Sequence, residues 1–148
     1  MTRFSDTIEA IVKAAGVYDD YLKSEHFHLK VKNGPYMDLV IESWWCNYQA
    51  DTLGVRHTSV AHYYEQNGDL MPDPDVVIDT GTGAPIEITQ PPPFGYFRVR
   101  WFDPDNGHAM INRYQDQAVR SFLTIWSRNL REQGFVQAAK SMKAGVEA

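Results

Sequence analysis

The chain has 148 residues, the size of one ordinary domain. Hydrophobic residues make up 43% and charged residues 22%, which predicts a packed core and argues against global disorder. No stretch approaches the roughly 18 apolar residues of a membrane helix, so no membrane partner is expected, and no signal peptide is predicted. The single cysteine, Cys46, excludes an internal disulfide framework and indicates a reducing, cytoplasmic compartment.

The net charge of -5 is unevenly distributed along the chain. Residues 57–97 hold six acids and no Lys or Arg, whereas residues 98–148 hold 5 acids and 8 basic residues. Either these blocks neutralise each other across the fold, which is the favoured interpretation, or the acidic block faces a cation or a basic partner. A protein that binds nucleic acid with its whole surface is disfavoured, because phosphates reward a basic excess.

The first predicted element is an amphipathic helix. Its apolar residues recur at steps of three and four, which places them on one face: Ile8, Ile11, Val12, Ala15, Tyr18 and Leu22. Ser5 or Asp6 is expected to cap this helix. Gly16 is expected to weaken it and to mark a point of close packing.

Strands are predicted next, because three Asn-Gly pairs lie beside runs of β-prone residues. Asn-Gly is the strongest short hairpin signal, and the pairs are Asn33-Gly34, Asn67-Gly68 and Asn106-Gly107. The strands are expected over residues 26–32, 37–42, 58–65, 70–71, 76–78, 85–89, 96–102 and 109–114. Short turns between neighbours favour an antiparallel meander.

The last third of the chain returns to helical periodicity. Residues 119–130 carry an apolar stripe that ends at Gly134, and a second short helix is expected after it. The predicted fold is therefore α+β, an antiparallel meander sheet of five to seven strands covered on one face by N-terminal and C-terminal helices. Residues 1–134 are expected to form the domain and residues 135–148 a C-terminal helical tail.

The densest polar stretch runs from His57 to Asp75. It contains candidate metal ligands in His57, His62, Asp69, Asp73 and Asp75. On a strand the two histidines point to opposite faces, which weakens a joint site, and the spacing matches no zinc motif. The favoured interpretation is turn chemistry at Asn67-Gly68-Asp69 and Asp73-Pro74-Asp75, with no metal cofactor.

A strand with alternating Arg and aromatic residues follows the acidic block. Its alternation predicts one common face for Tyr96, Arg98, Arg100 and Phe102. Such a face can bind single-stranded nucleic acid, although the strand lacks the basic lead of an RNA-stacking motif. The favoured interpretation is an ordinary sheet strand whose opposite face, Phe97, Val99 and Trp101, fills the core.

Aromatic side chains provide a third group of candidates. Trp44, Trp45 and Tyr64, together with Tyr96 and the two arginines of the strand above, are candidate contacts for a protein partner, because aromatics and Arg dominate interface anchors. Tyr63 and Phe94 could join them. Cys46 follows the tryptophan pair, but no base beside it in the sequence suggests a catalytic thiolate, so a buried Cys is expected.

The 17 residues 59–75, SVAHYYEQNGDLMPDPD, form a distinctive central motif. This motif is similar to that of an uncharacterised bacterial domain family found in proteins of phages, plasmids and other mobile elements. The resemblance implies a cytoplasmic accessory protein of mobile DNA. It brings no activity and no catalytic residues with it.

Three hypotheses follow, in order of preference. The first is a non-enzymatic accessory module that binds a protein partner, because no coherent catalytic constellation is present. The second is a nucleic-acid-binding module that uses the Arg and aromatic strand with the basic helix positions Arg113, Arg120, Arg128 and Arg131. The third is a metal-dependent hydrolase or nuclease at the polar stretch. A homo-oligomer is compatible with all three.

Overall fold

The computed structural model describes residues 3–45 and 54–147. Two helices come first, α1 (Phe4–Ala14) and α2 (Tyr18–Lys23). Eight strands follow in the described residues: β1 (His26–Asn33), β2 (Tyr36–Trp45), β3 (Arg56–Gln66), β4 (Asp69–Asp79), β5 (Pro85–Gln90), β6 (Gly95–Arg98), β7 (Arg100–Asp103) and β8 (His108–Ile111). The chain ends in α3 (Arg113–Glu132) and α4 (Phe135–Glu147).

The first six strands form one antiparallel sheet in the order β1-β2-β3-β4-β5-β6, while β7 and β8 form a separate pair. The predicted α+β meander is confirmed. The turn between β3 and β4 shows why its sequence specifies a hairpin. Asn67 and Gly68 both have positive φ, 53° and 85°, which a two-residue turn matching the strand twist requires.

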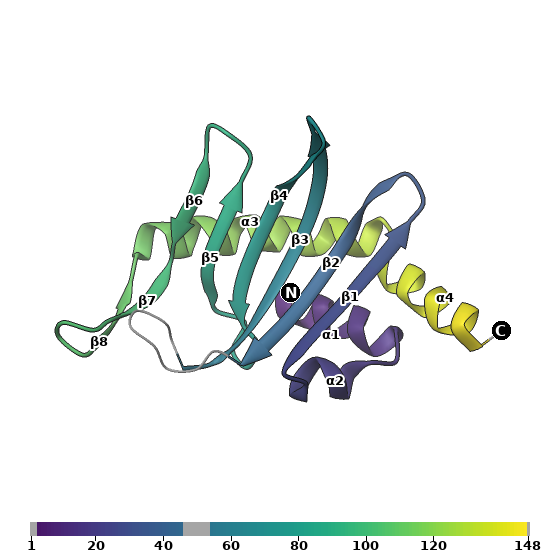
Figure 1. Ribbon diagram of the computed structural model, residues 1–148, viewed down its shortest axis with the longest axis horizontal. Helices are drawn as coiled ribbons and strands as arrows, with labels where there is room; N and C mark the ends of the chain where they lie inside the picture. Colours follow the sequence, from purple (N-terminus) through teal and green to yellow (C-terminus); the bar gives the residue numbers. More distant parts are fainter. Residues whose placement is uncertain (1–2, 46–53, 148) are drawn as a thin grey trace.

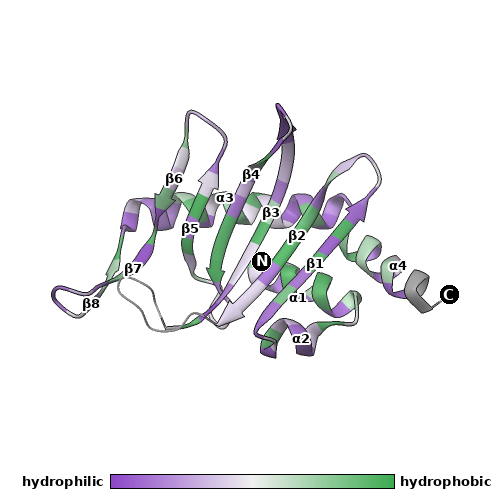
Figure 2. Cartoon of the chain, viewed as in Figure 1, coloured by the Kyte–Doolittle hydropathy of each residue, from purple (hydrophilic) through white to green (hydrophobic). Residues whose placement is uncertain are grey.

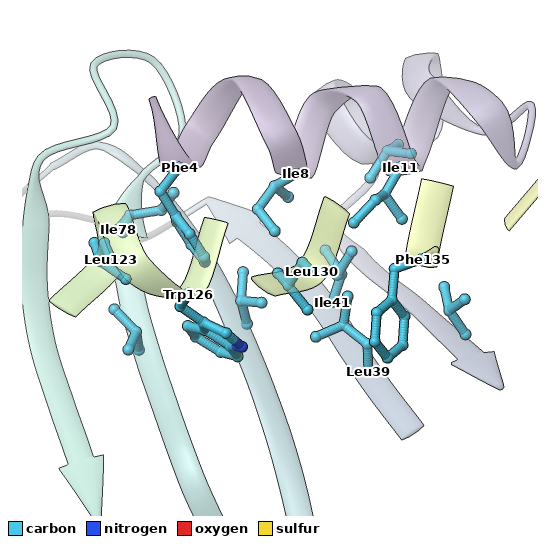
Figure 3. Packing of buried hydrophobic residues seen from close by; sticks show 14 of the residues in the cluster. Phe4, Ile8, Ile11, Leu39, Ile41, Ile78, Leu123, Trp126, Leu130 and Phe135 are labelled. Atoms are coloured by element: carbon cyan, nitrogen blue, oxygen red, sulfur yellow. The ribbon is translucent and has the colours of Figure 1, made fainter. Parts of the chain in front are cut away.

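Figure 1 shows α3 running behind the sheet and α1 behind β1 and β2, while α4 extends from the end of α3 past the β1 edge. These helices cover one face only, and the hydrophobic core lies between this face and the helices. Figure 3 shows Ile8 of α1 and Leu130 of α3 above Ile41 of β2, and all three side chains are fully buried. On the opposite face of the sheet, residues 3–45 and 54–147 place no helix (Figure 1). That face is called the open face below.

The single N-terminal helix expected from periodicity is divided in the structure. It breaks at Gly16, whose φ is +79°, so the apolar stripe is shared by α1 and α2. Gly16 is also the predicted point of close packing, because a Cβ there would lie 3.1 Å from Cδ of Lys143. The expected cap is wrong in position. Arg3 is the N-cap residue, and its backbone N–H donates to the Asp6 carboxylate at 3.2 Å.

Two strand predictions are also wrong. The residues 73–75, expected as a turn, lie inside the continuous strand β4, since this strand pairs with β3 along its length apart from one register shift. The run expected as one strand over 96–102 is divided at Val99. This fully buried residue donates its N–H to the carbonyl of Ile86 at 2.7 Å, while β6 pairs with β5 and β7 pairs with β8.

The helix after Gly134 packs on the core. Phe135 and Ala139 of α4 are fully buried and belong to the same hydrophobic cluster as α1 and the sheet. The domain division expected at residue 134 stays a prediction. In the described part of the chain, no helix is long and apolar enough to cross a membrane.

Arg56 at the start of β3 joins α2 to the sheet. Only 5% of its surface is exposed. Its Nε and Nη2 donate to the carbonyl of Tyr21 at 2.9 and 2.7 Å, its Nη1 donates to the carbonyl of Ser24 at 2.9 Å, and Nη2 also contacts Oγ of Ser43 at 2.9 Å. The planar guanidinium therefore satisfies carbonyls at the end of α2 that the helix leaves unpaired.

Candidate functional site

The strand register defines the side chains of the open face. Residues directly opposite on paired strands share a face, and the neighbours of buried core residues point the other way. The open face thus carries His26, His28, Lys30, Asp38, Val40, Glu42, Trp44, His57, Ser59, Ala61, Asp75, Val77, Glu87, Thr89, Tyr96 and Arg98. Figure 2 shows apolar segments in the middle of the central strands and polar residues at the β3–β4 turn.

The middle of the open face is acidic. Glu42, Asp75 and Glu87 come from β2, β4 and β5, and Ser59 donates its hydroxyl to Oδ1 of Asp75 at 2.7 Å. Burial raises the pKa of Asp75, the Ser59 hydrogen bond opposes this, and the negative charges of Glu87 and Glu42 raise the pKa further. Glu87 and Glu42 are therefore each near enough to Asp75 to repel its charge, which favours a cationic partner over an anionic one.

Side chains of the two edge strands contact Asp38, Glu42 and Glu87. On the β1 side, Nζ of Lys30 lies 3.5 Å from Oδ2 of Asp38, and Nε2 of His26 lies 3.2 Å from Oε2 of Glu42. On the β6 side, the hydroxyl of Tyr96 donates to Oε2 of Glu87 at 2.7 Å. These contacts fix the positions of the carboxylates. They are half-exposed pairs of small energetic worth, so a partner can compete for the same oxygens.

A hollow of about 510 Å³ opens on this face beside the β3–β4 hairpin. It is lined by His28, Lys30, Asp38, Val40, Glu42, Tyr63 and Leu70. The register of β3 against β4 shifts between Ala61 and Tyr63, and a bulge of this kind bends and twists the strand pair. Burial raises the pKa of Tyr63, and so do the nearby charges of Asp75 and Glu42. The volume lies in the range of sites that bind small ligands or single side chains.

Comparison with known proteins adds the family. The model of a domain of unknown function, DUF6908, matches residues 6–136. The chain belongs to the DUF6908 family. No curated protein and no solved structure matches it. The expected resemblance to an uncharacterised domain family is thus confirmed, and the motif at residues 59–75 lies within the matched region of this DUF6908 domain.

The candidate metal ligands of this DUF6908 domain lie in different surroundings. His57 is on the open face, with its ring 5.8 Å from that of Trp44. His62 points to the covered face, where its ring lies 5.5 Å from that of Trp126, and burial there lowers its pKa. Asp69 lies at the β3–β4 turn and Asp73 in β4. Among the described residues, no group of three His, Cys, Asp or Glu side chains is placed to hold a metal ion.

The Arg and aromatic candidates are separated too. Tyr96 and Arg98 remain on the open face, and the Arg98 guanidinium lies 4.2 Å from the ring centroid of Trp101. Arg100 does not share that face, because its Nη1 donates to Asp116 of α3 and to the carbonyl of Pro85, both at 2.7 Å. The helix that holds Asp116 lies behind the sheet (Figure 1).

The aromatic partner candidates also divide between faces. Trp44 lies on the open face, whereas Trp45 pairs in register with Arg56 and its ring lies 5.7 Å from that guanidinium. Tyr64 is half-buried in β3, beyond the bulge. Cys46 lies outside the described residues.

The sequence interpretation missed three side chains of the site. Asp38 and Glu42 fell within the strand predicted over 37–42 and Glu87 within the acidic block 57–97, and none of the three was assigned to a site. Two sequence features could have found these acids. The alternation of each strand decides which of its side chains share a face, and the hairpin register decides which residues of neighbouring strands stand opposite one another. The bulge lies in β4, because two β4 residues, Asp73 and Pro74, stand between the pairs Ala61–Asp75 and Tyr63–Pro72, where β3 has one. Its sequence signal is Pro74, since a proline within a strand is typical of edges and bulges.

Proposed function

We propose that this DUF6908 domain is a non-enzymatic accessory module that binds a basic surface of a protein partner through the open face of its sheet. The observation that carries the proposal is the acidic centre of a six-stranded face over which no helix of the described residues lies. An antiparallel sheet commonly leaves one face to solvent, but such a face is then polar throughout. Here Val40, Ala61 and Val77 provide an apolar floor between the carboxylates.

Charge complementarity selects the partner chemistry. Glu42, Asp75 and Glu87 lie at the centre of the face, and burial with mutual repulsion already disfavours the ionised form of Asp75. A basic partner would relieve that repulsion and steer association. Nucleic acid is the weaker candidate for this face, because its phosphates would meet the same carboxylates. From the resemblance of residues 59–75, we extend the proposal to a bacterial protein of mobile DNA that acts in the cytoplasm.

The test is a binding screen with matched variants. Arrayed peptides of twelve residues, either basic, neutral or acidic, and single- and double-stranded oligonucleotides are measured against the wild-type chain. A double variant on the open face, Glu87→Lys with Thr89→Lys, adds positive charge to that face at two positions that do not line the hollow. The control is Glu132→Lys with Gln137→Lys, which changes exposed positions on α3 and α4 by the same charge.

Basic peptides should bind the wild type and the control, and the open-face variant should lose that binding by tenfold or more. Affinity should fall as salt is raised, because exposed charges are screened. Oligonucleotides that bind more tightly than basic peptides would contradict the proposal. Sedimentation of the same variants tests a second copy as the occupant. Self-association that only the open-face variant loses would replace the separate partner with a homodimer.

A further inference from the structure

We propose that the hollow beside the β3–β4 hairpin receives an arginine side chain from the partner's basic segment, an inference that rests on the proposed function. Two carboxylates of β2, Asp38 and Glu42, line the hollow from one side of the strand. They lie four residues apart, so the strand alternation presents both to the same space. Four residues of strand span about 13 Å, so a cation in the hollow meets a carboxylate of the same rigid element toward either end.

The carboxylates of Asp38 and Glu42 can accept further hydrogen bonds from a guanidinium. Lys30 contacts one oxygen of Asp38, and His26 contacts one oxygen of Glu42. An ionised carboxylate has two oxygens with about four lone-pair sites, so these single contacts leave room for a forked donor. Arginine presents parallel N–H groups that match a carboxylate, whereas the lysine ammonium is a compact, more strongly hydrated charge.

Two apolar residues of the lining suit the aliphatic part of the same side chain, while His28 and Lys30 of β1 form the opposite wall. Val40 forms an apolar floor with 9% of its surface exposed, and Leu70 stands at the hairpin end with 71% exposed. An arginine stem laid between them would remove Leu70 from water. Tyr63 supplies an aromatic ring in the same wall, and the face of such a ring attracts a cation.

The inference is tested with peptides that differ in one side chain. Acetylated and amidated Gly-Ser-Arg-Ser-Gly is titrated into isotopically labelled protein and followed by amide chemical shifts. Two matched peptides carry lysine or neutral citrulline in place of arginine. The protein variants are Glu42→Gln and Leu70→Ser in the hollow, with Glu132→Gln on the exposed side of α3 as control.

The arginine peptide should shift the amides of Val40, Tyr63 and Leu70. Citrulline in the peptide, or Glu42→Gln in the protein, should weaken binding about tenfold, because each removes a charged pair of hydrogen bonds. Leu70→Ser should weaken it several-fold, the lysine peptide should bind less tightly than arginine, and the control should change nothing.

Equal affinity for arginine and citrulline, an unchanged affinity in Glu42→Gln, or no shift at 10 mM peptide (roughly ten times a 1 mM dissociation constant) would overturn the inference. These outcomes leave the proposed function standing if the longer basic peptides still bind and still lose affinity through Glu87→Lys with Thr89→Lys. Loss of that binding would overturn the function as well.

Discussion

Replacing Arg56 should destabilise the protein more than any other single charged residue that we discuss. Its guanidinium makes four contacts to Tyr21, Ser24 and Ser43, and it is nearly inaccessible to solvent. The carbonyl of Tyr21 also accepts the Ser43 hydroxyl at 2.6 Å, so it keeps one donor when Arg56 is removed. The carbonyl of Ser24 loses its guanidinium donor. With about 1.5–3 kcal/mol for each hydrogen bond to a charged group and incomplete additivity, Arg56→Ala should cost about 3 kcal/mol.

The measurement is urea unfolding followed by circular dichroism, together with thermal melting. A loss of about 3 kcal/mol corresponds to a fall in Tm of about 9 °C for a chain of this size. The stability of Arg56→Lys should lie between those of Arg56→Ala and the wild type, because one ammonium cannot reach the carbonyls of Tyr21 and Ser24 with the geometry of the guanidinium. Arg56→Met keeps the aliphatic stem and so separates lost packing from lost hydrogen bonds.

Arg128→Ala is the matched control, since Arg128 is exposed on α3, and it should change the free energy of unfolding by less than about 0.5 kcal/mol. If Arg56→Ala also stays within about 0.5 kcal/mol of the wild type, the role assigned to this arginine in holding α2 on the sheet is wrong.

Four further substitutions follow from the same structure. Phe135→Ala should cost about 3–5 kcal/mol in urea unfolding, because the side chain is fully buried, and a cost below about 1 kcal/mol would show that α4 does not share the core. Gly68→Ala should cost about 1–2 kcal/mol, since its φ is +85°, and an unchanged unfolding midpoint would contradict this turn geometry. Burial lowers the pKa of His62, so the unfolded chain binds its proton first. Stability should therefore fall as the pH drops below about 6.5, the ordinary pKa of His, and His62→Gln should flatten that part of the profile. The pKa of Asp75 is raised, so its charge costs stability above the folded pKa. Asp75→Asn should therefore be more stable than the wild type at pH 7, with Ser59 still able to donate, and the gain should vanish below about pH 3.9. A less stable Asp75→Asn at pH 7 would refute the repulsion inferred for the open face.

The candidate site was less accessible to sequence reasoning than the fold. The acidic block that contains Asp75 and Glu87 is visible in the sequence, and so is the possibility of a basic partner. Glu42 belongs to a different charge segment, and only the pairing of β2 with β3 brings it beside the other two. The prediction that Arg98 and Arg100 share one exposed strand face is wrong for a related reason. Val99 is drawn into the core, and Arg100 then pairs with a helix carboxylate 16 residues away in the chain.

Local chemistry determined the meander. Asn-Gly pairs such as Asn67-Gly68 specify tight turns, and alternation specifies which side of each strand is wet. These are properties of a few neighbouring residues, so the sequence by itself contains them. Tertiary structure alone decided that β4 continues through residues 73–75 and that Arg56 is buried. Each of these depends on contacts between distant segments, whose burial and hydrogen bonding outweigh local propensity.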